Sequence, residues 1–186
     1  MSHFQLLDVN TAPESVKTRL IEAEKNAGFL SNLLAVLAHS PAALETYQTV
    51  SAINARSSLR LKEREVVQLV AATHNGCRFC VAGHTSAAKN AAKLKPEIID
   101  ALRLEQAIDD PHFGPLVAFA RASLEQHGAV DQSIQDDFFA AGYTEQNALD
   151  VLLGLSLATL CNFANSLART ALNPQLQDYQ WEKSHA

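Results

Sequence analysis

The sequence has few aromatic residues and few runs of β-branched residues. Phe, Trp and Tyr make up 6% of the 186 residues, and alanine and leucine dominate the composition. Alanine and leucine favour helices, whereas β-branched and aromatic residues favour strands. No segment alternates between apolar and polar residues as a half-buried strand does. We therefore expect an all-α protein.

Clusters of positive charge are also missing. The formal net charge is −5, and lysine and arginine occur singly or in short pairs. Proteins that bind DNA or RNA usually present a basic patch or stripe. We therefore expect no nucleic-acid partner.

Long apolar runs and a secretory signal are absent as well. The longest apolar run, VLLGLSLATLC at 151–161, is shorter than the roughly 20 residues that cross a bilayer. The N-terminus, MSHFQLLDVN, lacks the basic and apolar segments of a signal peptide. We expect a cytoplasmic protein that does not enter a membrane.

Helix start and stop signals divide the chain, and no linker, repeat or low-complexity segment interrupts it. Residues 1–186 are therefore predicted to form a single domain, a bundle of about eight helices that pack as hairpins. Start signals are expected at a capping box over 11–14 with Pro13 in its first turn, and at 40–41, 96, 110–111 and 144. Stop signals are expected at 28, 75–76, 142 and 173–174, and the tail beyond is predicted to be loosely ordered.

Two of the three cysteines lie in one short stretch, HNGCRFCVAGH at 74–84. Asn75-Gly76 should end one helix, and Cys77 should start the next. In a reducing compartment, a Cys-x-x-Cys pair is more often catalytic or metal-binding than a structural disulfide. The stretch is therefore the first candidate for a functional site.

Helical spacing places Cys77, Cys80 and His84 on one face, because their offsets are three and four residues. Free N–H groups at the start of the helix favour a thiolate at Cys77. His84 lies one turn beyond Cys80 and can exchange a proton with it. Glu65 lies on the preceding helix, at a distance from the turn that allows it to meet His84 and raise its basicity.

The same stretch allows other interpretations. His74, Cys77, Cys80 and His84 could instead be four ligands of a zinc ion, which requires tetrahedral convergence at about 2.0–2.3 Å. Such a site would belong to a non-catalytic zinc-binding or redox-sensing module. Glu63 could replace Glu65 as the proton carrier, but its position predicts a solvated residue.

The remaining polar and thiol side chains are not assigned to catalysis. Cys161, in the last apolar helix, is predicted to be an inert core thiol. Asn162 and Asn165 are predicted to satisfy buried backbone groups or to line an interface. The remaining histidines are expected at the surface or at helix caps, namely His3, His39, His112, His127 and His185.

The stretch EREVVQLVAATHNGCRFCVAGH at 63–84 resembles the core signature of the alkylhydroperoxidase D (AhpD-like) and carboxymuconolactone decarboxylase superfamily. That signature reads Glu-x11-Cys-x2-Cys-x3-His, which Glu65, Cys77, Cys80 and His84 match. FLSNLLAVLAHSP at 29–41 is similar to the family's upstream helix, and the chain from Phe119 to 168 is similar to its downstream helices. The resemblance therefore covers most of the chain.

The resemblance implies an all-helical peroxidase that reduces small organic hydroperoxides or hydrogen peroxide. If the matching residues have the family's roles, Cys80 attacks the peroxide and Cys77 resolves the sulfenic acid to a disulfide. His84 and Glu65 would then relay protons. A dithiol or protein reductant restores the pair. Some peroxidase members have histidine or tyrosine just before the second cysteine, where this chain has Phe79, which cannot relay a proton.

The resemblance also implies a homo-oligomer, such as a dimer, trimer or hexamer. No flavin, haem or nucleotide fingerprint is present, so no bound cofactor is expected. The superfamily's other activity is decarboxylation of a lactone. Members with that activity usually lack the cysteine pair, so Cys77 and Cys80 favour the peroxidase.

Overall fold

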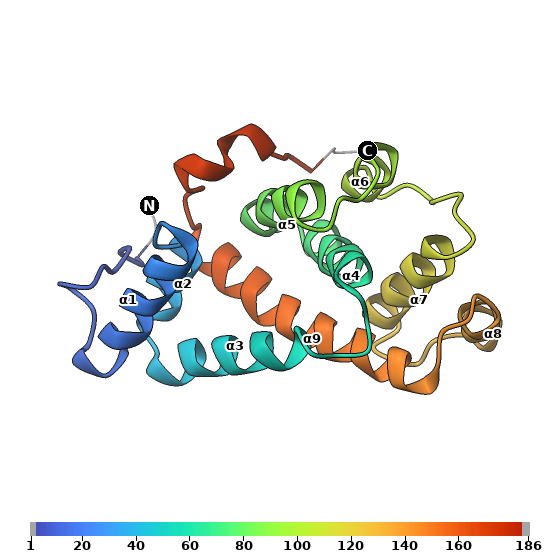
Figure 1. Ribbon diagram of the computed structural model, residues 1–186, viewed down its shortest axis with the longest axis horizontal. Coiled ribbons are helices and arrows are strands. Elements are labelled where there is room, and N and C mark those ends of the chain that lie inside the picture. Colours follow the sequence, from blue (N-terminus) through green and yellow to red (C-terminus); the bar gives the residue numbers. More distant parts are fainter. Residues whose placement is uncertain (1–2, 184–186) are drawn as a thin grey trace.

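The computed structural model describes residues 3–183, which form nine α-helices and one 3₁₀-helix and contain no strand (Figure 1). This confirms the predicted all-α class. The elements are α1 (Glu14–Ala27), α2 (Asn32–Leu37), α3 (Pro41–Asn54), α4 (Leu61–His74), α5 (Arg78–Asn90), α6 (Pro96–Arg103), α7 (Phe113–Glu125), α8 (Gln132–Ala140), α9 (Glu145–Ala168) and η1 (Pro174–Tyr179).

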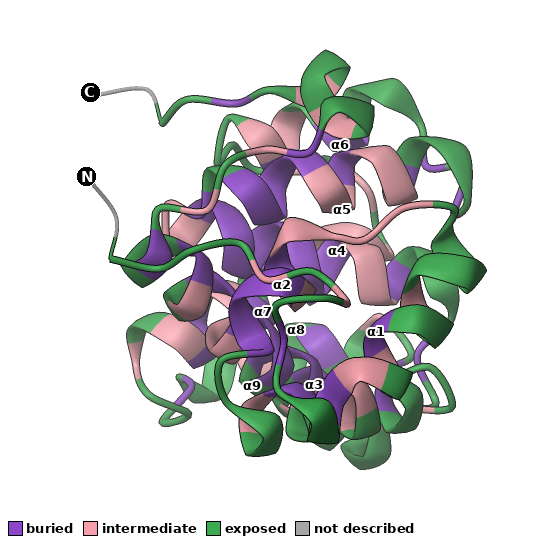
Figure 2. Ribbon diagram, turned by 90° about the vertical axis from the view of Figure 1, so that its left-hand side faces the viewer, coloured by how far each residue is buried: buried purple, intermediate pink, exposed green. Residues whose placement is uncertain are grey.

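Helices α4 and α9 form the centre of the fold. α4 packs against α5, α6, α7 and α9, and α9 also packs against α2, α3, α5 and α7. Figure 2 shows that burial is concentrated on the inner helices, while α1 and α3 expose an outer face. The α4–α9 contact is close at Gly154, where an added Cβ would lie 3.2 Å from Val67 Cγ1. The two helices thus place functional side chains against each other.

Several predicted helix signals are confirmed by their hydrogen bonds and dihedral angles. The Ser40 side chain caps α3 by accepting from Ala43 N at 3.2 Å, and the Thr144 hydroxyl caps α9 by accepting from Asn147 N at 3.2 Å. Gly28 and Gly142 follow α1 and α8 with φ of 78° and 94°, in the left-handed region. Polar caps and glycine stops therefore fix these boundaries locally.

The capping box expected over 11–14 is wrong. Helix α1 begins at Glu14, and no side chain caps its N-terminus. Thr11 instead donates its hydroxyl to Asp8 Oδ1 at 2.9 Å, and the same oxygen accepts from Thr11 N at 2.8 Å. A local Asp turn competes with helix capping for the threonine, as short polar side chains commonly do.

The prediction of a loosely ordered tail is also wrong for the described residues. After Asn173, η1 packs along α5. Trp181 is buried, and its Nε1 donates to Arg103 O at 2.8 Å. The Arg103 guanidinium in turn donates to Tyr179 O and Gln180 O at 3.2 and 2.7 Å. The buried Trp181 and the Arg103 side chain thus hold the segment against the end of α6.

Helix α9 is longer than the apolar run at 151–161, on which the membrane prediction was based. With 24 residues it is long and apolar enough to cross a membrane by length and composition, although half of its most apolar window is buried inside the fold. The length argument from 151–161 alone is therefore wrong. A central helix of a water-soluble protein meets the same criteria, and α9 packs against five other helices.

Candidate active site

The site is built on the turn between α4 and α5. Gly76 has φ of 65°, a left-handed conformation that glycine adopts at little cost. Cys77 N donates to Ala72 O at 2.9 Å, which closes the turn, and Cys77 caps α5 through its sulfur. The predicted break at 75–76 therefore places Cys77 at the very start of a helix.

The two thiols are free, buried and hydrogen-bonded to each other. Cys77 Sγ also accepts from Cys80 N at 3.3 Å. The Cys77 thiol lowers the pKa of Cys80 to about 7, further aided by the charge of His84, against the opposing effect of burial. The pKa of Cys77 is raised by its hydrogen bond to Cys80 and by burial. The lower pKa thus belongs to Cys80, contrary to the expectation from the helix end alone.

Two asparagines of α9 complete the surroundings of Cys80. Asn165 Nδ2 donates to Cys80 Sγ at 3.3 Å, and the Asn162 side chain also lowers the pKa of Cys80. Asn162 Oδ1 accepts from Asn75 Nδ2 at 2.9 Å, which ties the turn to α9. Sequence reasoning missed this role, although a pair of buried amides within an apolar helix was a signal that polar partners lie opposite.

The expected pairing of Glu65 with His84 is present. His84 Nδ1 lies 2.9 Å from Glu65 Oε2, and both side chains are largely buried. Burial disfavours the imidazolium, but the hydrogen bond and charge of Glu65 outweigh burial and raise the pKa of His84. The structure therefore brings all four predicted site residues into one hydrogen-bonded and electrostatically coupled group.

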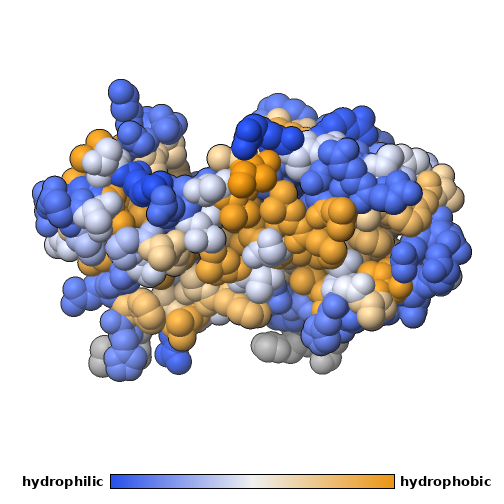
Figure 3. Space-filling view, turned by 90° about the horizontal axis from the view of Figure 1, so that it is seen from below, coloured by the Kyte–Doolittle hydropathy of each residue, from blue (hydrophilic) through white to orange (hydrophobic). Residues whose placement is uncertain are grey.

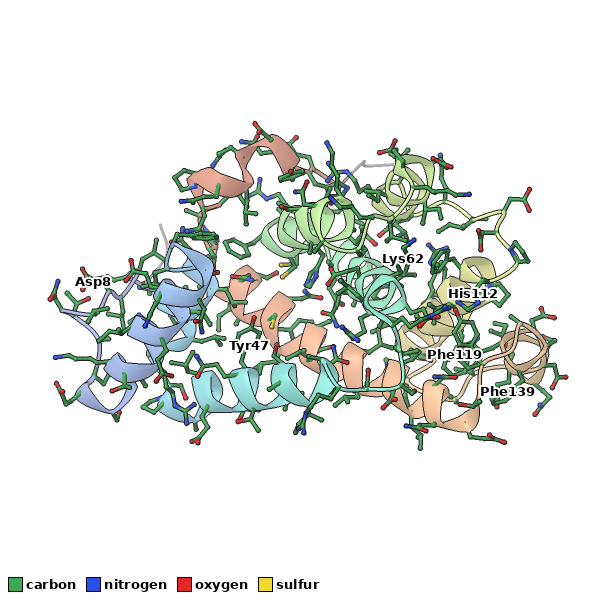
Figure 4. All side chains as sticks on the ribbon, in the orientation of Figure 1. Asp8, Tyr47, Lys62, His112, Phe119 and Phe139 are labelled. Carbon is green, nitrogen blue, oxygen red and sulfur yellow. The ribbon has the colours of Figure 1, made fainter. Side chains whose placement is uncertain are left out.

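A cavity of about 440 Å³ opens onto Cys80, His84 and Glu65. Its wall is mainly apolar, with polar side chains from α3 and α4; lining residues include Phe29, Leu33, Tyr47, Asn54, Leu61, Gln68, Leu157, Cys161 and Leu176. Figure 4 shows Tyr47 pointing from α3 toward the sulfur atoms between α3, α5 and α9. The cavity is large enough for a small organic molecule rather than for water alone.

Cys161 is buried in the hydrophobic core, which confirms the prediction, and it also lines the wall of this cavity. Burial raises its pKa, and the nearby Cys80 adds to that effect. The thiol is therefore protonated at neutral pH, which agrees with the expected inert chemistry. Tyr47 faces the same two sulfurs, and burial raises its pKa too.

The zinc alternative is not supported by the geometry. Among residues 3–183, no three His, Cys, Asp or Glu side chains are placed to hold one metal ion. His74, the fourth proposed ligand, precedes the turn at the end of α4, whereas His84 is engaged by Glu65. The observed contacts of the two cysteines are to each other and to amide donors.

Glu63 was predicted to be solvated, and this prediction is wrong. His112 was expected at the surface or at a helix cap, and it is the N-cap residue of α7. Glu63 is 4% exposed, and its carboxylate accepts from Arg60 N at 2.6 Å and contacts His112 Nε2 at 2.7 Å. His112 stacks on Tyr143, with ring centroids 4.8 Å apart, and lies beside α7 in Figure 4. The cluster ties the start of α4 to α7 and to the start of α9, away from the cysteines.

The chain is similar to known proteins in sequence and in fold. Residues 40–126 match the sequence model of the carboxymuconolactone decarboxylase family, and no curated protein sequence matches significantly. Among solved structures, a peroxidase-related protein with an alkylhydroperoxidase AhpD core from Ralstonia eutropha JMP134 superposes with a TM-score of 0.78 at 20% identity, covering 94% of each chain.

Two further structures are similar in fold. A peroxidase-related protein from Silicibacter sp. TM1040 has a TM-score of 0.77 at 16% identity, covering 94% of this chain and 92% of that one. A variant of the debrominase Bmp8, solved with 2,3,4-tribromopyrrole, has a TM-score of 0.78 at 15% identity and 96% coverage of both chains. The chain thus shares the fold of these AhpD-like structures, and a little under half of it, residues 40–126, matches the carboxymuconolactone decarboxylase family.

Proposed function

We propose that the chain is a thiol-dependent peroxidase that reduces organic hydroperoxides or hydrogen peroxide through Cys77 and Cys80. The observation that carries the proposal is the environment of Cys80, whose pKa is lowered to about 7 and whose sulfur faces a cavity that His84 also lines. A thiolate is the reactive form of cysteine, and an ordinary thiol with a pKa of about 8.5 is mostly protonated at pH 7.

In the first step, the Cys80 thiolate attacks one oxygen of the peroxide and the O–O bond breaks. The sulfur becomes a sulfenic acid, and the alkoxide leaves with the electron pair of that bond. His84, held by Glu65 at 2.9 Å, supplies the proton that converts the alkoxide to an alcohol. Phe79 does not enter this relay, because the Glu65–His84 pair already reaches the cavity.

In the second step, the Cys77 thiol attacks the sulfenic sulfur and a water molecule leaves. A disulfide forms, because the two sulfurs already lie in hydrogen-bonding contact and have only two residues between them. A dithiol then reduces the disulfide and closes the cycle. No bound cofactor is needed, because the electrons come from the external dithiol.

Two other activities known in the superfamily or its fold are less well supported. Lactone decarboxylation does not require a pair of thiols, so it would not explain why the surroundings of Cys77 and Cys80 lower the pKa of Cys80. Debromination is the activity named for the similar Bmp8 structure, which holds 2,3,4-tribromopyrrole. Assay of 2,3,4-tribromopyrrole beside a hydroperoxide separates the two: bromide release without peroxide consumption would replace the proposal.

Homo-oligomerisation and a cytoplasmic location belong to the same proposal. α9 exposes Leu149, Phe163 and Leu167 at 68%, 60% and 72%. Figure 3 shows apolar side chains gathered in the middle of the face on which α3 and α9 lie. Such a face is suited to contact another subunit, and free thiols persist in a reducing compartment.

The test is consumption of cumene hydroperoxide with dithiothreitol as the reductant. Cys80→Ser and Cys77→Ser should each abolish turnover, while Cys161→Ser, which removes a protonated thiol from the same cavity, should retain most of it. Folding of each variant is checked by circular dichroism. Turnover by Cys80→Ser equal to that of the unmodified protein would end the peroxidase proposal.

A further inference from the structure

The cysteine pair is approached from two sides, and each cysteine faces one of them. The 440 Å³ cavity is lined by Cys80, His84 and Glu65, but Cys77 is not part of its wall. A separate depression of about 260 Å³ is lined by Cys77 and not by Cys80. Phe79 lines both hollows, so its side chain forms the wall between them.

The depression at Cys77 contains buried polar atoms without partners. Asn165 is only 3% exposed and lines the depression; its Nδ2 donates to Cys80 Sγ, but its Oδ1 has no hydrogen-bond partner. The hydroxyl oxygen of Thr170, in the same wall, is also buried and unpaired. Unpaired buried acceptors are costly and rare. They therefore point to a ligand that donates hydrogen bonds here.

The rim of the depression is positively charged. Arg78 and Arg169 are exposed at its edge, and neither has a carboxylate within ion-pairing distance among residues 3–183. The Lys183 side chain lies over Gly76, 3.9 Å from the position of an added Cβ, but its Nζ pairs with Glu105 Oε1 at 3.8 Å, so the unpaired charges are those of the two arginines. Glu182 lines the adjoining hollow and is the acidic group there. In a chain of net charge −5, this local excess of positive charge favours an acidic partner.

We propose that this depression is the docking site of the reductant, an acidic protein with an exposed dithiol, and that the dithiol attacks Cys77 Sγ of the oxidised pair. The inference rests on the proposed dithiol–disulfide cycle. In this arrangement the peroxide binds on one side of Phe79 and the reductant on the other. The reductant can therefore reach the oxidised cysteine pair without first displacing the reaction product from the Cys80 cavity.

The chemistry balances in two exchanges. A reductant thiolate forms a bond to Cys77 Sγ, the Cys77–Cys80 bond breaks, and its electron pair leaves on Cys80 Sγ. The second reductant thiol, once deprotonated, attacks the reductant sulfur in the mixed disulfide and expels Cys77 as a thiolate, which takes up a proton. One dithiol is oxidised to a disulfide, and the protein disulfide is reduced to two thiols.

The direction of attack agrees with the leaving groups. A thiol of lower pKa leaves faster in disulfide exchange. Attack at Cys77 expels Cys80, whose thiolate is favoured by the charge of His84 and by the Asn165 and Asn162 side chains, none of which depends on a free Cys77 thiol. Attack at Cys80 would expel Cys77, whose pKa burial raises even without the Cys80 thiol.

The site of attack can be mapped on the unmodified protein. The disulfide is formed with diamide, treated briefly with the anionic monothiol 2-mercaptoethanesulfonate, and quenched with iodoacetamide. Trypsin cuts after Arg78 and so separates Cys77, in the peptide 65–78, from Cys80, in the peptide 79–89. We expect the mixed disulfide on 65–78 and the alkyl group on 79–89. The reverse pattern would overturn the proposal.

The role of the positive rim is tested with two synthetic dithiol peptides. One has glutamates around its cysteines, and the other has lysines at the same positions. We expect the glutamate peptide to reduce the diamide-formed disulfide faster. Arg169→Gln should slow that peptide about threefold at low salt, which is the effect of one unit charge at roughly 7 Å in water. Arg56→Gln, which removes an exposed arginine of α3's C-terminal cap region, should leave the rate unchanged.

Equal rates for the two peptides, or an Arg169→Gln variant indistinguishable from Arg56→Gln, would refute reductant docking at this rim. The docking test does not depend on the peroxidase proposal, because diamide forms the disulfide without any peroxide. A protein that fails to reduce peroxide can therefore still pass or fail the docking test. Arg169→Gln should also leave the rate of disulfide formation by cumene hydroperoxide unchanged, since Arg169 does not line the Cys80 cavity.

Discussion

Replacement of Asn165 by alanine tests how the protein lowers the pKa of Cys80. The variant removes the Nδ2 donor that lies 3.3 Å from Cys80 Sγ. Hydrogen bonds to charged groups contribute about 1.5–3 kcal/mol, and a long bond to sulfur belongs at the lower end of that range. One pKa unit corresponds to about 1.36 kcal/mol, so we expect the pKa of Cys80 to rise by about one unit.

The rise has a defined effect on the rate. Starting from a pKa of about 7, the thiolate fraction at pH 7 should fall from about one half to about one tenth, a loss of about fivefold. At pH 10 the thiolate is nearly complete in both proteins, so their rates should nearly converge. The midpoint of the pH–rate profile should therefore move to higher pH, while the maximal rate at high pH stays the same.

The assay is the rate of Cys80 alkylation by iodoacetamide from pH 5.5 to 10, measured by mass spectrometry of the peptide 79–89. Asn26→Ala, on the exposed end of α1, is the matched control and should keep the original profile. A midpoint that stays at about 7 in Asn165→Ala, in a protein that remains folded, would refute the role of this amide.

Three further variants test the proton relay and the second buried cluster. His84→Ala should slow peroxide reduction more at pH 7 than at pH 9.5, where the thiolate forms unaided; an equal loss at every pH would mean that His84 carries no proton. Glu65→Gln should act in the same direction without unfolding the protein, so reduced stability with an unchanged rate would make Glu65 structural. Glu63→Gln should lower the free energy of unfolding by about 1–3 kcal/mol at pH 7. Burial opposes the Glu63 carboxylate, but hydrogen bonds from Arg60 outweigh it and lower its pKa, so the stabilisation is present above the unfolded pKa of about 4.3 and is lost as the pH falls below it. Urea unfolding at pH 7 and pH 4 measures this difference, and a Glu63→Gln variant as stable as the unmodified protein at pH 7 would contradict it.

The sequence predicts the parts of the site that depend on local geometry. The Asn75-Gly76 turn and helical spacing place Cys77, Cys80 and His84 on the start of α5. The hairpin then brings Glu65 to His84, which lies only 19 residues away in the chain. Short-range periodicity is enough for these contacts, because a tight turn leaves two helices few ways to pack.

Contacts between distant segments were not predictable in the same way. Asn165 reaches Cys80 across 85 residues, and His112 reaches Glu63 across 49. Both depend on how α9 and α7 pack against α4, which no local pattern encodes. The pKa order of the two thiols was misjudged only partly for the same reason. The helix start favours Cys77, whereas the hydrogen bond from the Cys77 thiol, the charge of His84 and the amides of α9 favour Cys80.

The central claim is that peroxide oxidises Cys77 and Cys80 to a disulfide, and a thiol titration tests it most directly. The chain has three cysteines, all free in the structure. After one equivalent of cumene hydroperoxide, we predict that two thiols disappear, that Cys161 remains, and that dithiothreitol restores all three. Three thiols still titrating after the peroxide, or a loss that dithiothreitol does not reverse, would contradict the account.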